Sequence, residues 1–357
     1  MIGAGVVGLS VAWLLARQGH RVVLLDPDLE RGQSDAAGSS AALGLLMAQI
    51  YRRSSGRGWR LRQQSLALWQ EWRQELEQRG HVLPFRPGLL QLATSEQELQ
   101  AQQRLAEQRQ QQGLPLRLLS QEELQALQPA LPHGSLGGLL SERDGQLDPI
   151  AAMTALRRDG NQHGLEIRSE TALRLERGVN DADQRWLVHG SGGTRLSCHW
   201  LVLSAGLGSP ELLEPLDHDR PQSPVLGQAL ELELPAGCTD ATAWPGSLSW
   251  GGINLVPRPQ RRLWLGATVE PGCRQGEASA LAELGQLGGA APDWLRQATV
   301  LRQWQGLRAR PENRPAPLLE ELEPGLLLNS GHYRNGVLLA PACAAWVSAQ
   351  IAAGMGR

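Results

Sequence analysis

Apolar positions near the start of the chain first follow a helical period and then become continuous. Residues 6–18 repeat apolar side chains along one helix face, and Gly19 is placed to end that helix. The run RVVLLD that follows has the character of a buried strand and closes on Asp26. The pattern therefore predicts one helix and one buried strand within this first part of the chain.

Later segments mix the two periods. A polar helical stretch is predicted at about residues 58–79, and the Gln/Glu/Leu-rich run at 95–128 predicts a pair of surface helices. Residues 165–204 instead contain short strands separated by turn signals. The apolar run VLLAPACAAWVSAQIAAG, residues 337–354, predicts one more helix. The chain does not continue as regularly alternating strands and helices, which a simple doubly wound sheet would require.

A glycine motif precedes the first predicted helix. Gly3, Gly5 and Gly8 form G-x-G-x-x-G. In a dinucleotide-binding fold the first glycine makes a tight turn, the second lets the backbone approach a pyrophosphate, and the third lets helix and strand pack closely. The helix N-terminus then faces the phosphates, and Asp26 is placed to accept hydrogen bonds from the adenosine ribose. Motif, helix, strand and acid together predict a dinucleotide site.

The strand that should precede this motif is short, because only Met1 and Ile2 come before Gly3. First strands typically need about five or six residues. Either the native start lies upstream, or the domain tolerates a two-residue strand at the centre of its sheet. We expect the first, and with it weak cofactor binding or poor folding of the sequence as it stands.

Length and composition set outer bounds. A chain of 357 residues is long for one core, so two lobes are expected. Net charge is −2, which gives no field to recruit nucleic acid or anionic lipid. No uninterrupted apolar run reaches the roughly 18 residues that span a bilayer, since Ser348 and Gln350 interrupt the run at 337–354. We therefore expect a cytoplasmic protein with no nucleic-acid partner and no membrane span.

The scarce residue types exclude some chemistries. Four Cys without CxxC spacing and eight dispersed His argue against a disulfide framework and a metal site, and fit a reducing compartment. The chain contains no Lys, a bias that accompanies abundant Arg. Without Lys there is no Schiff-base chemistry and no Walker-type phosphate lysine.

A second small-residue turn bears on which dinucleotide is bound. The predicted strand WLVLSAG ends in Ala205 and Gly206, where backbone could approach a nucleotide. The chain has one dinucleotide-binding unit at its amino terminus, then an insertion of short strands at 165–204, and then this late turn. This order of features favours FAD over NAD.

Motifs along nearly the whole chain carry a family resemblance. They include GAGVVGLSVAWLLARQGHRVVLLD, SSAALGLLMA, QLDPIAAMTALRR, PVLGQALEL, LVPRPQRRLWLGATVEPG, WQGLRAR and GHYRNGVLLAPA. The chain resembles the D-amino-acid-oxidase-like FAD oxidoreductases, and most specifically the glycine oxidases of thiamine biosynthesis. The last two motifs are the specific ones, since the glycine motif alone occurs in many FAD enzymes.

The resemblance implies an α/β (α+β), two-lobed fold. It has a Rossmann-like FAD-binding domain of the glutathione-reductase type and a substrate domain built from a sheet and helices. The FAD-binding domain is expected at 1–80, 140–220 and 300–357, and the substrate domain at 81–139 and 221–299. Segments such as GQALELELP and RRLWLGATVE are expected in the sheet of the substrate domain.

The resemblance also implies the residues that hold the substrate. Arg308 in WQGLRAR matches the family's carboxylate-binding arginine, and an always-charged planar fork suits a carboxylate. Arg310 shares the strand face and is the weaker rival. Arg334 matches the family's second substrate-contacting arginine. Asn254 stands where relatives commonly carry a Tyr, so the pocket would accept a larger or different substrate.

The loop GHYRNG, residues 331–336, is expected beside the flavin ring, and the following helix would offer its N-terminal NH groups to the reduced ring. The flavin loop of the family appears here as Ala42 to Leu46, with a mild change of sequence. The glycine motif and the resemblance together assign to the cofactor Gly3, Gly5, Val6, Val7, Gly8, Asp26, Pro27, Gly38, Ser39, Leu43, Gly44, Leu45, Ala172, Ala205, Gly206, His332, Tyr333, Arg334, Asn335, Gly336, Val337 and Leu338.

The implied activity is oxidation of glycine or another small amino acid or amine. Hydride transfer from Cα to the flavin gives an imine, then an oxo acid and ammonia, and the imine could serve thiazole formation. The FAD is expected to be non-covalent, since no attachment residue matches. O2 is expected to be a poor acceptor, since no Lys is available near the flavin. The alternatives are a D-amino-acid or secondary-amine dehydrogenase with another acceptor, and a non-catalytic FAD-binding subunit. A homo-oligomer is possible in each case.

Overall fold

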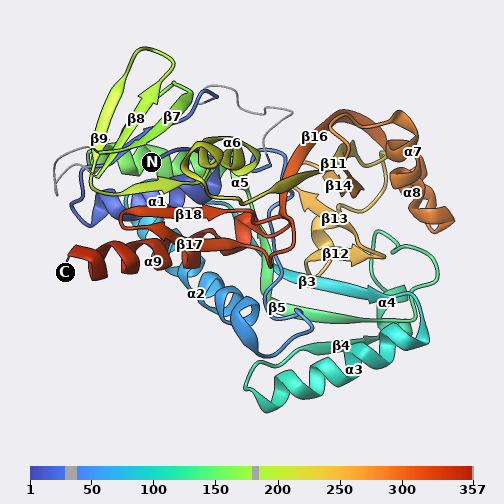
Figure 1. Ribbon diagram of the computed structural model, residues 1–357. Helices are drawn as coiled ribbons and strands as arrows, with labels where there is room; N and C mark the ends of the chain where they lie inside the picture. Colours follow the sequence, from blue (N-terminus) through green and yellow to red (C-terminus); the bar gives the residue numbers. More distant parts are fainter. Residues whose placement is uncertain (29–37, 179–184, 356–357) are drawn as a thin grey trace.

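The computed structural model describes residues 1–28, 38–178 and 185–355. The chain passes repeatedly between two parts (Figure 1). One part contains both chain ends and the helices α1, α5 and α9. The other contains a large sheet whose strands include β3, β5 and β11 to β16.

A mostly parallel sheet forms the first part. Ile2 bridges to Leu25 of β1 on one side and to Leu203 of β10 on the other, both in parallel. The short strand before the glycine motif therefore lies between two longer neighbours. The other pairings are β1 with β6, β10 with β18, and β18 with β17. The strands are β1 (Val23–Leu25), β6 (Glu166–Arg168), β10 (Leu201–Leu203), β17 (Leu318–Glu323) and β18 (Leu326–Ser330).

Helices pack together beside this sheet. The predicted helices at 6–18, 58–79 and 337–354 are confirmed as α1 (Val6–Arg17), α2 (Gly56–Gln78) and α9 (Gly336–Met355). α1 and α2 both contact α9, and α1 contacts α5 (Pro149–Gln162). α9 is long and apolar enough to cross a membrane, but most of its apolar window is buried against the rest of the chain. Here it is a core helix, as its contacts with α1 and α2 require.

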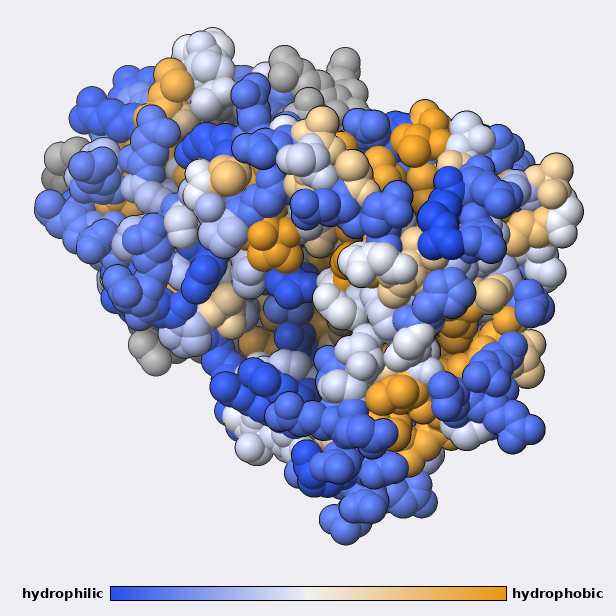
Figure 2. Space-filling view, turned by 90° about the vertical axis from the view of Figure 1, so that its right-hand side faces the viewer, coloured by the Kyte–Doolittle hydropathy of each residue, from blue (hydrophilic) through white to orange (hydrophobic). Residues whose placement is uncertain are grey.

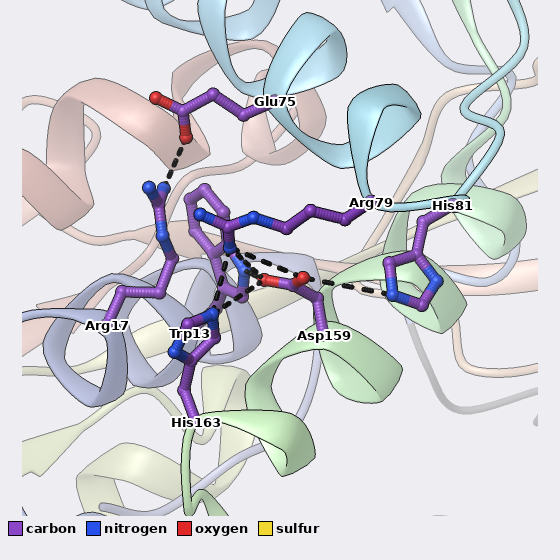
Figure 3. A network of polar contacts seen from close by, with 7 residues as sticks. All are labelled: Trp13, Arg17, Glu75, Arg79, His81, Asp159 and His163. Atoms are coloured by element: carbon purple, nitrogen blue, oxygen red, sulfur yellow. Dashed lines mark hydrogen bonds and ion pairs between the residues drawn. The ribbon is translucent and has the colours of Figure 1, made fainter.

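A buried carboxylate ties three of these helices together (Figure 3). Asp159 of α5 is fully buried. It accepts a hydrogen bond of 2.7 Å from Nε1 of Trp13 in α1, and its Oδ2 lies 3.0 Å from Nη1 of Arg79, which follows α2. His81 and His163 lie 3.8 and 3.6 Å from its oxygens. A buried charge is tolerated only when it is paired and hydrogen-bonded, and Asp159 meets both conditions.

The second part is built on a sheet in the order β15-β11-β14-β13-β12-β3-β5-β2. β16 adds to β11, and β4 adds to β5. The segments GQALELELP and RRLWLGATVE contribute to β11 and β14 in this sheet, as predicted. The strands are β2 (Leu45–Leu46), β3 (Phe85–Ala93), β4 (Arg117–Ser120), β5 (Gly137–Leu147), β11 (Gln222–Glu233), β12 (Ser247–Trp250), β13 (Ile253–Arg258), β14 (Arg262–Gly266), β15 (Glu270–Pro271) and β16 (Thr299–Pro311).

Strand pairing adds detail to two of the predicted segments. Most of β5 and β16, which the division at residues 139/140 and 299/300 assigns to the FAD-binding domain, is hydrogen-bonded into the second sheet. The register of β16 against β11 runs from Thr299 to Pro311, so nearly its whole length belongs there. The helical run at 95–128 is also interrupted, because β4 pairs with β5 between α3 (Glu96–Gln111) and α4 (Gln121–Gln125).

The remaining elements cover the edges. Residues 165–204 contain the predicted short strands, of which three form a separate antiparallel sheet. The small helix Ser209–Leu213 contacts this separate sheet, and the helix Ala278–Gln286 contacts the second sheet. The view in Figure 2 shows a mostly hydrophilic face with a recess near its centre and apolar residues in small separate groups. These elements are β7 (Ala172–Arg177), β8 (Trp186–Gly190), β9 (Arg195–Cys198), α6 (Ser209–Leu213), α7 (Ala278–Gln286) and α8 (Asp293–Arg296).

Candidate active site

A cavity of about 1470 Å³ is lined by residues from both parts of the molecule. Pockets for one small ligand usually measure about 300–1,000 Å³. The volume therefore suits a large ligand together with a small one. Its lining includes the turn before α1, the loop before α9, and residues of β3, β11, β12, β13 and β16.

The turn before α1 forms one end of this cavity. Gly3 and Gly5 line it, while a Cβ on Gly8 would lie 1.9 Å from the carbonyl oxygen of Gly3. Gly8 therefore allows the helix to pack closely on the turn, as the motif predicted. Asp26 also lines the cavity and accepts hydrogen bonds from the backbone N–H groups of Ala4 (2.6 Å) and Asp28 (2.8 Å). Each oxygen keeps further lone pairs for a sugar hydroxyl.

The segment from Gly38 to Leu45 forms a wall next to this turn. Ser39 Oγ accepts a hydrogen bond of 3.1 Å from the backbone N–H of Val6, so the wall is tied to the first turn of α1. Gly44 has a φ of +81°, and a Cβ there would lie 1.8 Å from the carbonyl oxygen of Leu147. Only glycine fits that close approach.

The loop 331–336 lines the cavity along its whole length. The backbone N–H of Tyr333 donates to the carbonyl of Ala309 (3.1 Å), which ties the loop to β16. Asn335 accepts two hydrogen bonds of 3.1 Å from the guanidinium of Arg62 on α2. α9 begins at Gly336, and its first residues line the cavity. The first N–H groups of a helix lack partners within it, so this end can bind negative charge.

His332 in this loop is a neutral, buried group. Its Nε2 lies 3.3 Å from Sγ of Cys343, which is about two turns into α9. Burial lowers the pKa of His332 to about 3, with a smaller contribution from the positive charge of Arg57. Burial likewise raises the pKa of the Cys343 thiol to about 12. At neutral pH this pair carries no charge and contributes neither a general acid nor a thiolate.

Arg308 projects from β16 into the cavity lining. Its Nη1 donates to the carbonyl oxygens of Leu226 (3.0 Å) and Thr268 (3.1 Å). Burial lowers the pKa of Arg308, and the nearby positive charge of Arg334 lowers it further. Within the described parts of the chain, neither arginine forms an ion pair with a carboxylate. Two arginines are thus held near each other, and no carboxylate of residues 1–28, 38–178 or 185–355 forms an ion pair with either.

Asn254 of β13 is nine-tenths buried and lines the cavity. Its Oδ1 is buried without a hydrogen-bond partner. Ser249 of β12 lies beside Asn254 in the sheet register, and Gln91 of β3 lies beside Ser249. All three line the cavity, so a row of neutral polar side chains crosses its wall.

Behind the wall, Asp144 holds the backbone that leads to Tyr51. This fully buried carboxylate accepts hydrogen bonds of 2.8–3.0 Å from the N–H groups of Ala48, Gln49 and Ile50. Burial raises the pKa of Asp144 to about 6, although these hydrogen bonds oppose the rise. The segment continues into Tyr51, whose ring lies 4.1 Å from the guanidinium carbon of Arg62.

Most residues predicted for the site lie together around the cavity. Val6, Gly8, Pro27 and Ala172 do not line it. The side chain of Val6 is in the core, Gly8 packs the helix on the turn, Pro27 is exposed, and Ala172 is buried in a core cluster. Sequence reasoning missed Tyr51, Arg62, Gln91, Ser249 and Asp144, which no motif marks.

Comparison of the sequence with known protein families assigns the chain to one of them. A model of the family described as FAD dependent oxidoreductase matches residues 1–350. The chain belongs to this family. FAD is therefore the cofactor of the protein. The glycine cradle, Asp26 and the start of α9 fit it, because they supply close backbone approach, a ribose acceptor and positive helix ends.

The chain is also similar to individual members of the FAD-dependent oxidoreductases. It is 28% identical to a glycine oxidase of Geobacillus kaustophilus, over 96% of this chain and 89% of that protein. It is 29% identical to a bifunctional protein ThiO/ThiG of Synechocystis, covering 98% of this chain and 50% of that protein. The crystal structure of the G. kaustophilus glycine oxidase superposes with a TM-score of 0.85 at 26% identity, covering 97% and 92% of the two chains.

Proposed function

We propose that the protein oxidises the Cα–N bond of glycine or of another small amino acid or amine. The observation that carries this proposal is the pair Arg308 and Arg334, two cations in one cavity that form no ion pair with a carboxylate among the described residues. Among the described residues, the cavity lining contains six arginines and two acids, and the acids, Asp26 and Asp28, belong to the nucleotide end. A small carboxylate is the ligand that this charge distribution favours.

The chain's own residues account for binding and orientation. Arg308 holds the substrate carboxylate, and Arg334 adds a second positive charge. When bound, FAD supplies the acceptor for a hydride from the substrate Cα. The start of α9 stabilises negative charge beside the loop 331–336. His332 is buried against Cys343, and burial lowers its pKa, so we assign it no role as a base. Hydride transfer needs no strong side-chain base when the substrate binds with its amine neutral. The resulting imine then hydrolyses to an oxo acid and ammonia.

The names of the relatives support a role in thiamine formation. Glycine oxidases and ThiO/ThiG proteins are among the most similar curated proteins. We infer from this likeness that the imine of glycine could be delivered to thiazole synthesis.

A second candidate rests on Asn254, whose short side chain enlarges the pocket. It is a dehydrogenase of D-amino acids or secondary amines that passes electrons to an acceptor other than O2.

Anaerobic bleaching of the flavin tests the proposal. We expect glycine, sarcosine or a small D-amino acid to reduce the bound FAD, with loss of the yellow absorption. Re-oxidation by air and by an artificial acceptor then separates an oxidase from a dehydrogenase. If no small amine bleaches the flavin, amine oxidation is wrong, and a non-catalytic FAD-binding subunit becomes the better account.

Replacing Arg334 by alanine should slow flavin reduction about 10-fold or more. The substituted enzyme loses one of two cations near the carboxylate, and hydrogen bonds to charged groups contribute about 1.5–3 kcal/mol. FAD affinity is measured first, by titration of the apoenzyme, because Arg334 lies in the loop 331–336 that lines the cofactor cavity. An unchanged reduction rate in fully loaded enzyme would remove Arg334 from the substrate site.

A further inference from the structure

Gly227 lies in the middle of β11, opposite Gly306 of β16, and both line the cavity. A Cβ atom built on Gly227 would lie 2.1 Å from Nη2 of Arg308 and 2.4 Å from its Cζ and Nη1. Non-bonded carbon atoms normally stay about 3.5–4.0 Å apart. The guanidinium of Arg308 therefore occupies the space in which any other residue type at this position would carry its side chain.

The backbone at Gly227 does not require glycine. Its φ lies outside the left-handed region that favours this residue. The position also pairs regularly with β16, between the neighbouring pairs of the same ladder. Glycine inside a strand weakens it, because there is no side chain to pack and more entropy to lose. The strand alone gives no reason for a glycine here, whereas the position of Arg308 does.

We propose that Gly227 is a positioning residue whose missing side chain makes a flat seat for the guanidinium of Arg308. On this seat Nη1 is held by the carbonyl oxygens of Leu226 and Thr268. The other donors of the guanidinium remain for the substrate carboxylate. The inference rests on the proposed function in taking Arg308 as the carboxylate ligand.

The carbonyl of Thr268 is itself held in place. Thr268 Oγ1 donates to Oε1 of Glu270 (2.5 Å), and accepts from the backbone N–H of Gln228 (2.8 Å). The side-chain Nε2 of Gln228 also donates a hydrogen bond of 3.0 Å to Oε1 of Glu270. Glu270 attracts Arg308 electrostatically without forming an ion pair with it. Arg308 is thus hydrogen-bonded to a carbonyl that a side-chain network holds in place, so a guanidinium displaced by a new Cβ would have to lengthen or break these hydrogen bonds.

The variant Gly227→Ala should weaken carboxylate binding about 10- to 100-fold. The guanidinium must move by roughly 1 Å or more, and a displacement of that size can cost about 100-fold in rate. The probe is glycolate, a carboxylate without an amine, titrated into the FAD-loaded enzyme and followed by the change in the flavin absorption spectrum. FAD itself should stay bound, since the new atom is directed at Arg308.

A double-mutant cycle separates this role from a general effect on the strand. In the Arg308→Ala background the collision is absent, so Gly227→Ala should change neither glycolate affinity nor melting temperature by much. The matched control is Gly138→Ala in β5. It adds a Cβ inside a buried strand, 2.8 Å from Cδ1 of Leu90, outside the cavity. It should lower stability and leave glycolate binding unchanged.

Each outcome decides the inference. Equal losses of stability from Gly227→Ala with and without Arg308 would overturn it, as would failure of both variants to fold. Folding of the double variant alone would support it, because only removal of the arginine then makes room for the Cβ. If glycolate binds and the cycle holds while no amine bleaches the flavin, the seat stands and the proposed reaction fails. If glycolate does not bind the wild type, the melting temperatures alone decide whether the seat exists.

Discussion

Replacing Arg308 by alanine should slow anaerobic reduction of the flavin by glycine, or by the best substrate found, about 30- to several-thousand-fold. The substrate carboxylate then loses a charged partner in a buried site, which typically costs about 2–5 kcal/mol, and each 1.36 kcal/mol is tenfold in rate. FAD should remain bound, because the hydrogen bonds of Arg308 go to Leu226 in β11 and to Thr268 between β14 and β15. Stopped-flow absorbance at saturating FAD measures the effect.

Arg310→Ala provides the matched control. Arg310 is two residues further along β16 and is exposed, and it does not line the cavity. Its guanidinium carbon lies 5.9 Å from the ring centroid of Tyr333, a cation–π contact of small energy at an exposed site. The Arg310 variant should reduce its flavin within about threefold of the wild-type rate. If the two variants bleach equally fast, Arg308 is not the carboxylate ligand.

The parts of the fold that could be predicted are those whose signal is local. α1 and α2 follow from the helical spacing of their own residues, α9 follows from a continuous apolar run, and the turn at Gly3 follows from a contiguous motif. The loop 331–336 could be singled out because its polar residues are adjacent in the sequence. Each of these predictions needs only neighbouring positions, so tertiary contacts do not alter it.

The errors arise where distant pairing overrides a local pattern. Arg117–Ser120 lie within a helical run, but they form β4 because β5 offers a partner strand. The family resemblance assigns most of β16 to the FAD-binding domain, whereas its hydrogen bonds are with β11. No helical period or composition shift encodes either pairing.

The same limit applies to the site. Gln91, Ser249 and Asn254 come from three strands, and they form a row only because β3, β12 and β13 pair in a particular register. Gly227 is one of 41 glycines, and its sequence neighbourhood does not point to Arg308. Residues that act through a partner on another strand become visible only when the strands are paired.

Asp144 belongs to this group, and its replacement by alanine should have a large effect on stability. The carboxylate accepts hydrogen bonds from three consecutive backbone N–H groups, those of Ala48, Gln49 and Ile50. Asp144 is fully inaccessible to solvent. A buried donor left without a partner costs about 1–3 kcal/mol. Three such donors predict a loss of roughly 3–5 kcal/mol in the free energy of unfolding, allowing for partial relaxation, which is a large share of the usual 5–15 kcal/mol.

Urea unfolding of the FAD-loaded enzyme measures this loss, and Asp240→Ala is its matched control. Asp240 also accepts from two backbone N–H groups, those of Thr242 and Arg261, but it is only partly buried and lies outside the cavity. Water can replace it, so its removal should cost about 1 kcal/mol. The Asp144 variant should also bind FAD and glycolate more weakly, because Met47, Ile50 and Tyr51 line the cavity from the segment that Asp144 holds. Equal losses in the two variants would mean that the segment keeps its place without the carboxylate, and that Asp144 does not shape the cavity.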